Sequence, residues 1–164
     1  MRILGLDPGL RHTGWGLVDK QGTRFVFVAA GVINPNEKLP LANRLSELHD
    51  SLKKLIDEWQ PDTAAVEETF VNKNPSSTLK LGQARGVVLM TPAMCGLQVG
   101  EYTPNQIKKT ITGVGHAEKN QVDMMVRTLL KTVPEGIPAD ASDALAIALT
   151  HGFLSPSQHN ILGY

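Results

Sequence analysis

The sequence predicts an α/β fold with a mixed five-stranded sheet, three antiparallel strands followed by parallel ones, flanked by helices. Three features predict it: short apolar strands with turns between them fill the first third, a long amphipathic helix follows, and strands then alternate with helices. Strands joined by tight turns pair antiparallel, whereas strands joined through helices pair in parallel. A chain of 164 residues fits one domain, so we expect a single domain over residues 1–164.

The first three predicted strands form a meander. They cover Ile3 to Leu6, Thr13 to Val18 and Thr23 to Val32. Pro8-Gly9 separates the first two, and Asp19-Lys20-Gln21-Gly22 separates the second from the third. Pro and Gly are the residues that turns demand, so these strands are expected to be antiparallel neighbours.

A long helix is predicted from Leu41, because apolar residues recur in steps of three and four as far as Trp59, and Pro61 then stops it. The rest of the chain alternates. The predicted elements are strands at Thr63 to Glu67 and Leu97 to Tyr102, and helices at Ser77 to Met94, Pro104 to Thr112, Ala117 to Lys131 and Asp140 to Leu154. The polar segment Ser155 to Tyr164 is expected to be a tail that is flexible or contacts a partner.

Composition excludes several classes of protein. Hydrophobic residues make up 41% and charged residues 20%, and no apolar stretch approaches the ~20 residues of a membrane helix. No secretory signal is recognised at the N-terminus, so we expect a cytoplasmic protein without a membrane partner. The single cysteine, Cys95, lies in an apolar stretch, which favours a packing role in a reducing compartment.

The formal net charge is zero, but the charges are unevenly distributed. Between Val71 and Lys131 there are eight basic residues and three acidic ones. A metal-dependent nuclease needs acids that hold cations and separate basic residues that hold phosphates. Scattered, solvated surface charges are the alternative interpretation of this pattern.

Four acids occupy positions that suit a common site. Asp7 ends the first predicted strand and Glu67 ends the fourth, while Asp140 and Asp143 lie three residues apart on the last helix. If the two strands are parallel, both carboxylates emerge at the edge where α/β sheets place ligands. Residues at i and i+3 share a helix face, so the helix pair can complete the cluster.

Each acid also has a simpler interpretation. Asp7 could serve only the Pro-Gly turn, and Asp140 could serve only as the N-cap of the last helix. Glu67 follows interior-type residues, where an unpaired carboxylate would be costly. Its neighbour Glu68 competes for the same role, because strand alternation points only one of the two into the site.

Converging carboxylates repel one another unless cations lie among them. Oxygen ligands suit Mg²⁺ or Mn²⁺, and neither the single cysteine nor the five histidines offer a zinc spacing. Two such ions about 4 Å apart can clamp the attacking and leaving oxygens of a displacement at phosphorus. Phosphodiester hydrolysis is therefore the leading chemistry.

Five segments in order resemble the RuvC-type Holliday junction resolvases, bacterial endonucleases with a ribonuclease H-like fold. The resemblance covers nearly the whole chain. The segments are Ile3-Leu4-Gly5-Leu6-Asp7-Pro8-Gly9 with Thr13-Gly14-Trp15-Gly16, Val66-Glu67 with Phe70, Leu79-Lys80-Leu81-Gly82-Gln83-Ala84-Arg85-Gly86, Gly113-Val114-Gly115-His116-Ala117-Glu118-Lys119, and Asp140-Ala141-Ser142-Asp143-Ala144-Leu145-Ala146.

The resemblance implies that Asp7, Glu67, Asp140 and Asp143 bind the metal and are catalytic, which favours Glu67 over Glu68. It implies a Mg²⁺-dependent endodeoxyribonuclease, with Mn²⁺ as a substitute and two ions per site, that resolves four-way DNA junctions by paired symmetric nicks in recombination and repair. It also implies a homodimer and a branch-migration helicase complex as partner. A two-fold dimer matches the two-fold symmetry of a four-way junction.

The resemblance also suggests DNA-binding residues. Phe70 matches an aromatic residue that stacks on bases at the junction centre, and Lys108 and Lys119 match lysines near the scissile phosphate. Lys73, Lys80 and Arg85 are weaker candidates, because a solvated helix face would look the same. A core position is the alternative interpretation for Phe70.

Other functions remain as alternatives. A ribonuclease H-like nuclease could act on another branched substrate or on an RNA–DNA hybrid with the same metal chemistry. An actin-like nucleotide-binding domain would use the turn from Asp7 to Gly14 for phosphate, but such proteins need two domains of this kind. A catalytically inactive junction-binding protein would have little reason to keep four converging acids.

Overall fold

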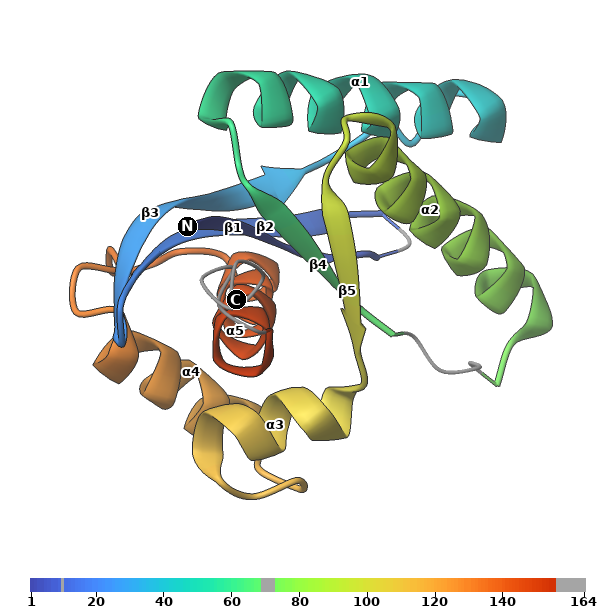
Figure 1. The fold of residues 1–164 in the computed structure, drawn as a ribbon. Helices are drawn as coiled ribbons and strands as arrows, with labels where there is room; N and C mark the ends of the chain where they lie inside the picture. Colours follow the sequence, from blue (N-terminus) through green and yellow to red (C-terminus); the bar gives the residue numbers. More distant parts are fainter. Residues whose placement is uncertain (10, 69–72, 156–164) are drawn as a thin grey trace, which may run out of the picture.

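The structure is a computed structural model, and it describes residues 1–9, 11–68 and 73–155 (Figure 1). The tail predicted from Ser155 onward and the position of Phe70 lie outside the described residues, apart from Ser155 itself. The elements in chain order are β1 (Arg2–Asp7), β2 (Thr13–Gln21), β3 (Arg24–Ile33), α1 (Leu41–Trp59), β4 (Thr63–Glu67), α2 (Pro75–Met94), β5 (Gln98–Tyr102), α3 (Pro104–Thr112), α4 (Lys119–Leu129) and α5 (Ala139–Leu154).

The five strands form one sheet in the order β3-β2-β1-β4-β5. β1 pairs antiparallel with β2, and β2 with β3, whereas β4 is parallel to β1 and β5 is parallel to β4. This confirms the predicted mixed sheet. β2 is longer than predicted and runs to Gln21, because the hairpin turns only at Gly22, whose φ of 62° suits glycine.

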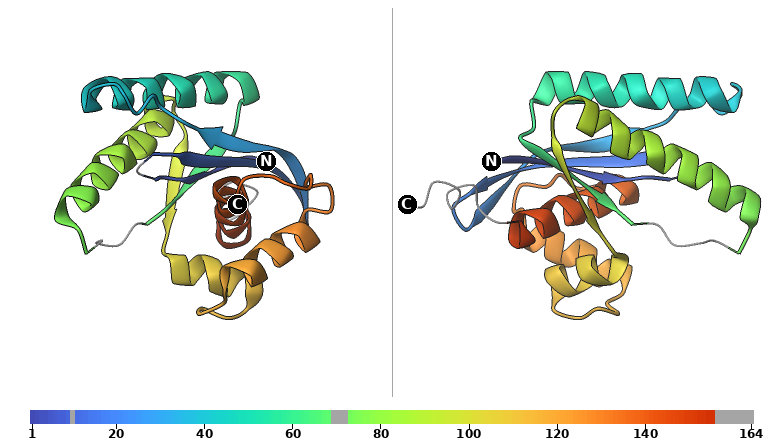
Figure 2. Two further views of the ribbon diagram at one scale, coloured as in Figure 1. Left: turned by 180° about the vertical axis from the view of Figure 1, so that it is seen from behind. Right: turned by 45° about the vertical axis from the view of Figure 1, so that its right-hand side comes forward.

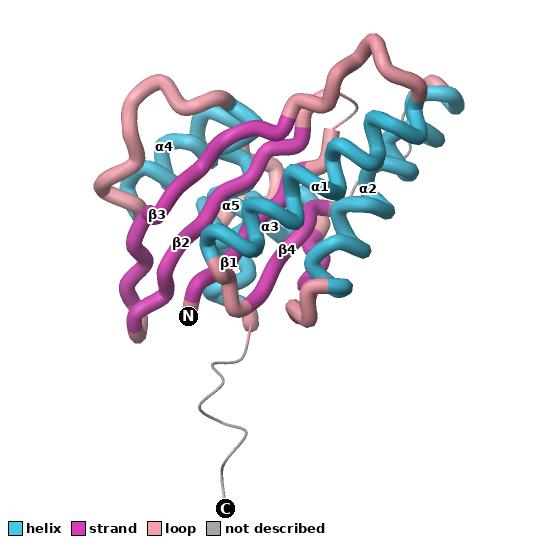
Figure 3. The backbone as a smooth tube through the Cα atoms, turned by 90° about the horizontal axis from the view of Figure 1, so that it is seen from above, coloured by secondary structure: helices cyan, strands magenta, loops and turns pink. Residues whose placement is uncertain are grey.

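Helices cover both faces of the sheet (Figures 1 and 2). α1 and α2 pack on one face, where alternate strand residues such as Leu4, Leu6 and Leu17 meet Leu48 and Leu52. α3, α4 and α5 cover the opposite face, which receives the other set of strand residues. Alternation along each strand therefore fills two separate cores. Figure 3 shows α1 and α2 side by side over the sheet.

α5 lies directly against β1 and β2, and glycines in these strands allow the close approach. A Cβ on Gly5 would lie 2.0 Å from the carbonyl oxygen of Ala144, and one on Gly14 would lie 2.0 Å from the carbonyl oxygen of Asp140. Real Cβ atoms essentially never come that close to another heavy atom. The backbone of α5 can therefore lie where a larger strand residue would exclude it.

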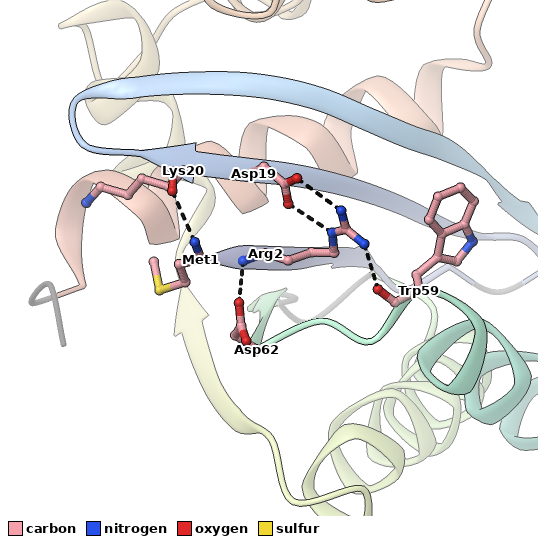
Figure 4. A network of polar contacts seen from close by, with 6 residues as sticks. All are labelled: Met1, Arg2, Asp19, Lys20, Trp59 and Asp62. Carbon is pink, nitrogen blue, oxygen red and sulfur yellow. Dashed lines mark hydrogen bonds and ion pairs between the residues drawn. The ribbon is translucent and has the colours of Figure 1, made fainter.

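A polar network stabilises the end of the sheet at which β1 begins (Figure 4). The guanidinium of Arg2 donates to both carboxylate oxygens of Asp19, at 2.9 and 3.0 Å, and to the carbonyl of Trp59 at 2.9 Å. The Arg2 backbone N–H donates to Asp62. These bonds connect the starts of β1 and β4 to β2 and to the end of α1.

The described helices include none that combines the length and the apolar character needed to cross a membrane.

α2 begins at Pro75, two residues before the predicted start, because the Asn74 side chain accepts hydrogen bonds from the backbone N–H groups of Ser76 and Ser77. Such a cap satisfies backbone donors that the first helical turn leaves unpaired.

Candidate active site

Two acids lie at neighbouring strand ends. Asp7 is the last residue of β1 and Glu67 is the last residue of β4. The strands are parallel with Leu6 opposite Val66, so the two acids follow equivalent positions. The carboxyl ends of parallel strands are where α/β folds place their ligands. A hydrogen bond joins the Asp7 and Glu67 side chains.

Two further acids come from the first turns of α5. This helix begins at Ala139 after Pro138, so Asp140 lies inside it, and the alternative interpretation of Asp140 as an N-cap is wrong. Carboxylate oxygens of Asp7, Asp140 and Asp143 lie within 4.8 Å of one another. The contact between Gly14 and the Asp140 backbone sets how closely α5 approaches the strand ends.

Burial and mutual repulsion make three of these carboxylates difficult to ionise, those of Asp7, Glu67 and Asp143. Burial, then the charges of Glu67, Asp143 and Asp140, raise the pKa of Asp7 to about 8. Burial also raises the pKa of Glu67 and of Asp143 above their usual range. In each case loss of hydration is the largest cause, and neighbouring negative charge adds to it.

Two predicted lysines lie beside the acids. The Nζ of Lys119 lies 2.8 Å from an Asp143 carboxylate oxygen, and this hydrogen bond raises the pKa of Lys119. Lys108 and Lys119 line a cavity of about 260 Å³ together with Glu67 and Asp143. The Lys119 side chain is 66% exposed, so its ammonium group is accessible to an incoming anion.

Contacts between α4 and α5 support this corner of the site. The Ser142 hydroxyl donates to Asp123 at 2.5 Å, and Arg127 donates to the same carboxylate at 3.0 Å. Ser142 precedes Asp143, and Asp123 lies one turn after Lys119, so the bond fixes the helix with the acid against the helix with the lysine. Asp123 is one of the three acidic residues counted between Val71 and Lys131, and no local pattern in the sequence indicated this contact.

The other predicted basic residues do not line the cavity beside the acids. Arg85 forms an ion pair with Glu101 and donates to the carbonyl oxygen of Glu67 at 3.4 Å, so it holds the end of β4. Lys73 is exposed before α2, and Lys80 lines a different cavity, on the α1 and α2 face. The backbone N–H of Glu68 bonds to the Tyr102 carbonyl just beyond the end of β4.

The donor set fits a hard divalent cation. All four side chains offer carboxylate oxygens, which are the ligands that Mg²⁺ and Mn²⁺ prefer. Lys119 is the cation that forms an ion pair with the cluster among the described residues, and one ammonium does not balance four carboxylates. A bound cation would remove the repulsion that raises these pKa values.

We expect the thermal stability of the metal-free protein to fall as the pH rises from 6.5 to 8.5. A carboxyl group whose pKa is higher in the folded chain contributes stability that is present at low pH and lost as the pH rises through the folded pKa. The pKa of Asp7 is raised from an ordinary value of 3.8 to about 8, so the loss begins well below pH 6.5 and its last part, up to the folded pKa, falls in this range. In EDTA we expect Tm to decrease by roughly 5 °C, and millimolar Mg²⁺ to restore it at pH 8.5.

Thermal unfolding followed by circular dichroism across this pH range tests the expectation. The range starts at 6.5 because burial lowers the pKa of His151, which acts in the opposite direction below that pH. Asp7→Asn is the matched control, since it removes the carboxyl group that has the strongly raised pKa, and its Tm should depend less on pH and on Mg²⁺. An equal pH slope in both proteins would contradict the assignment.

Comparisons with known proteins add to this geometry. A family model described as crossover junction endodeoxyribonuclease RuvC matches residues 3–151. The chain is 56% identical over 153 residues to a protein of that description from Rhodopseudomonas palustris (strain BisA53), covering 92% of this chain and 86% of the relative. Identity to the Azorhizobium caulinodans protein of the same description is 59% over 152 residues, covering 92% and 89%.

Solved structures of Holliday junction resolvases also match this chain. The structure of T. thermophilus RuvC in complex with Holliday junction substrate matches with a TM-score of 0.86 and 34% identity, over 93% of each chain. The yeast mitochondrial Holliday junction resolvase Ydc2 shares the fold, with a TM-score of 0.67 and 14% identity over 90% of this chain and 76% of that one.

Proposed function

Because the chain belongs to the RuvC family of crossover junction endodeoxyribonucleases, we propose that it cleaves four-way DNA junctions by metal-dependent phosphodiester hydrolysis in recombination and repair. The observation that carries this proposal is the convergence of Asp7, Glu67, Asp140 and Asp143 at one edge of the sheet, where a lysine lies beside them and the pKa values of Asp7, Glu67 and Asp143 are raised. Carboxylates that converge in this way repel one another unless cations bind between them, and bound cations attract an anionic substrate.

We assign the four acids to metal binding and catalysis, with Mg²⁺ as the physiological ion and two ions per site. When bound, such ions lower the pKa of the attacking water and stabilise charge on the phosphorus oxygens. The chain's own contribution is to hold four oxygen donors on rigid elements, two on strand ends and two on one helix. Mn²⁺ has the same ligand preference and should substitute.

Two lysines bring positive charge to the site, which the negatively charged phosphates of DNA require. Lys119 and Lys108 line the same cavity as Glu67 and Asp143, so we propose that their ammonium groups contact the phosphates next to the scissile bond. Lys119 can move from Asp143 to a phosphate once cations neutralise the acids, because its side chain is mostly exposed. For Arg85, the bonds to Glu67 and Glu101 support a positioning role rather than a phosphate contact.

Cleavage of an end-labelled synthetic four-way junction tests the proposed function. Matched linear duplex and RNA–DNA hybrid serve as competing substrates, each with Mg²⁺ and with EDTA. We expect paired nicks at symmetric positions in the junction only, and only with metal. Cleavage of the hybrid alone would assign the chain to ribonuclease H activity, and absence of junction cleavage in several sequences would overturn the proposal.

Phe70 lies outside the described residues, but its place between Glu67 and α2 puts it close to the site in the chain. We propose that it stacks on bases at the junction centre, as the family resemblance implies. Base–aromatic stacking contributes about 1–3 kcal/mol per base, so Phe70→Ala should slow junction cleavage by roughly 10-fold or more. Duplex affinity measured by fluorescence anisotropy should change little, and an equal loss of both would indicate a core residue instead.

We propose that the protein acts as a homodimer through the outer face of α2. This face carries Leu79, Met90 and Met94, whose side chains are 65%, 48% and 70% exposed. Gly86 lies between them with open space beyond it, which allows another helix to approach closely. Exposed apolar patches of this kind commonly mark protein interfaces.

A charge placed in this face should separate the dimer. Met90→Glu would bury a carboxylate in an apolar contact, which costs several kcal/mol when it lacks a partner. We expect sedimentation equilibrium to give a monomer, and junction cleavage to leave single nicks instead of pairs. Lys54→Glu, at an exposed site on α1, is the control. A variant that remains dimeric would exclude this face of α2.

The family resemblance supports two broader proposals. We propose that a branch-migration helicase complex presents the junction to this protein, and that both act in the cytoplasm. Co-purification of the purified proteins on a four-way junction, compared with linear duplex, tests the first. A resolvase that cleaves at the same rate with and without the helicase complex would argue against a functional partnership.

A further inference from the structure

A second cavity lies at the same end of the sheet as the acid site, but on the face that α1 and α2 cover. Its volume is about 280 Å³, and residues from the β1–β2 connection, the start of α1 and α2 line it. The start of α1 lies at the same end of the sheet as the β1–β2 connection (Figures 1 and 2). None of the four acids lines this cavity, and the proposed catalytic site does not use it.

Cationic side chains outnumber acidic ones in the lining. Arg11, Arg44 and Lys80 line the cavity, and the acid among the lining residues is Glu37. The Nε of Arg11 lies 3.6 Å from a Glu37 oxygen, with side chains 71% and 50% exposed, so this pair is too long and too solvated to hold the guanidinium firmly. In the described part of the chain, Lys80 has no ion-pair partner.

Hydroxyl groups complete the lining. Thr13 lines the cavity while its residue is only 2% exposed. Ser77 adds a second hydroxyl. Arginine, lysine, serine and threonine side chains are the groups that contact DNA phosphates. Leu45 and Leu48 add apolar walls to the cavity.

The cavity and the acid site lie on opposite faces of the sheet, next to adjacent residues of β2. Neighbouring residues on β2 point to opposite faces of the sheet. Thr13 therefore lines the cavity, whereas Gly14 packs against the backbone of Asp140 on the other face. Asp7, the last residue of β1, belongs to the acid cluster, whereas Gly9, in the connection that follows β1, lines the cavity.

We propose that Arg11, Arg44, Lys80 and Thr13 form a second phosphate site, which holds a backbone phosphate of the junction while the acids engage the scissile one. This inference rests on the proposed function and adds a contact that would fix the strand on both faces of the sheet edge. Contacts of this kind carry no sequence information, but they set the register and orientation of the DNA.

The test compares the double variant Arg11→Gln/Lys80→Gln with the control Lys53→Gln/Lys54→Gln. Both variants remove two positive charges from exposed positions, and the control positions lie on α1 outside the cavity. Arg44 is left unchanged because it is half-buried and engaged within the fold. Equal Tm values for both variants and the unmodified protein show that folding is unchanged.

Junction affinity is then measured in EDTA as a function of salt. Each lost phosphate contact should reduce the slope of log K against log[salt] by about 1 unit. We expect the slope to fall by about 1 to 2 units in the cavity variant and to stay unchanged in the control. Equal slopes in the cavity variant and the unmodified protein would overturn the inference.

A second measurement identifies the phosphate. A series of junctions, each with one neutral methylphosphonate at a different position near the cleavage site, is bound to each protein. At the contacted position neutralisation should weaken binding by about 3- to 10-fold for the unmodified protein and the control, but not for the cavity variant. The same pattern of losses in all three proteins would overturn the inference.

Two other outcomes are distinguishable. If the cavity serves a free anion, inorganic phosphate should raise the Tm of the unmodified protein but not of the cavity variant, and the variant should bind junctions normally; this would overturn the DNA assignment. If the unmodified protein neither binds nor cleaves four-way junctions, the proposed function itself fails.

Discussion

Asp7→Asn is expected to reduce junction cleavage by about 10³-fold or more while junction binding is retained. Asp7 is the acid on which the others converge: it shares a hydrogen bond with Glu67 and lies within 4.8 Å of Asp140 and Asp143. The amide preserves the shape of the side chain but cannot provide a negatively charged ligand. Binding should persist because the proposed phosphate contacts are on other residues.

Single-turnover cleavage with Mg²⁺ and anisotropy in EDTA measure the two effects separately. In EDTA the variant should bind the junction at least as tightly as the unmodified protein, because one repulsive charge is gone. Glu68→Gln is a matched control just beyond the end of the neighbouring strand β4, and it should cleave normally. Parallel loss of binding and cleavage in Asp7→Asn would instead point to a folding role.

The comparison of Glu67→Gln with Glu68→Gln also decides between the two neighbouring acids. The strand pattern alone left both open, and the resemblance favoured Glu67. In the structure Glu67 bonds to Asp7 and lines the cavity with both lysines. Only Glu67→Gln should lose cleavage by the same order as Asp7→Asn.

Gly14→Ala is expected to reduce cleavage by at least about 100-fold, although it adds one methyl group at a position without a chemical role. The new Cβ would lie 2.0 Å from the carbonyl oxygen of Asp140 and 2.5 Å from its carbonyl carbon. Both are backbone atoms, so α5 has to move away from β2. That movement displaces Asp140 and Asp143 relative to Asp7, and a displacement of about 1 Å is enough for such a loss.

The same change should lower the free energy of unfolding by about 1–3 kcal/mol, because the close packing of α5 is disturbed. Gly82→Ala, where a Cβ would meet no atom within 4 Å, is the control and should match the unmodified protein in cleavage. Urea unfolding and single-turnover cleavage measure both quantities. If Gly14→Ala cleaves normally, the position of α5 does not limit catalysis.

The features that could be predicted from the sequence are those with local periodicity. Apolar strands ending at Asp7 and Glu67, joined through a helix, predicted the parallel pair that the structure shows. The i, i+3 spacing of Asp140 and Asp143 predicted a shared helix face, and both side chains lie at the acid site. Period and chain order were sufficient for these features because each depends on nearby residues.

Other features depend on contacts between distant residues, and no local pattern encodes them. Asp19 was placed in a turn because it is polar, but it lies in β2, where its pairing with Arg2 stabilises it. The bond between Asp123 and Ser142 joins two helices. Thr13 was predicted only as the start of a strand and Arg11 was not singled out, because their common cavity depends on how α1 and α2 pack.

The division of the acids between the sheet and α5 has a consequence for biosynthesis. Asp7 and Glu67 are made early, whereas Asp140 and Asp143 arrive only with the last helix. Domains form as chains emerge from the ribosome, N-terminal parts first. A nascent chain that ends before residue 139 therefore carries half of the acids and no partner helix. The four-acid site can therefore form only after α5 has been synthesised and has packed against the sheet.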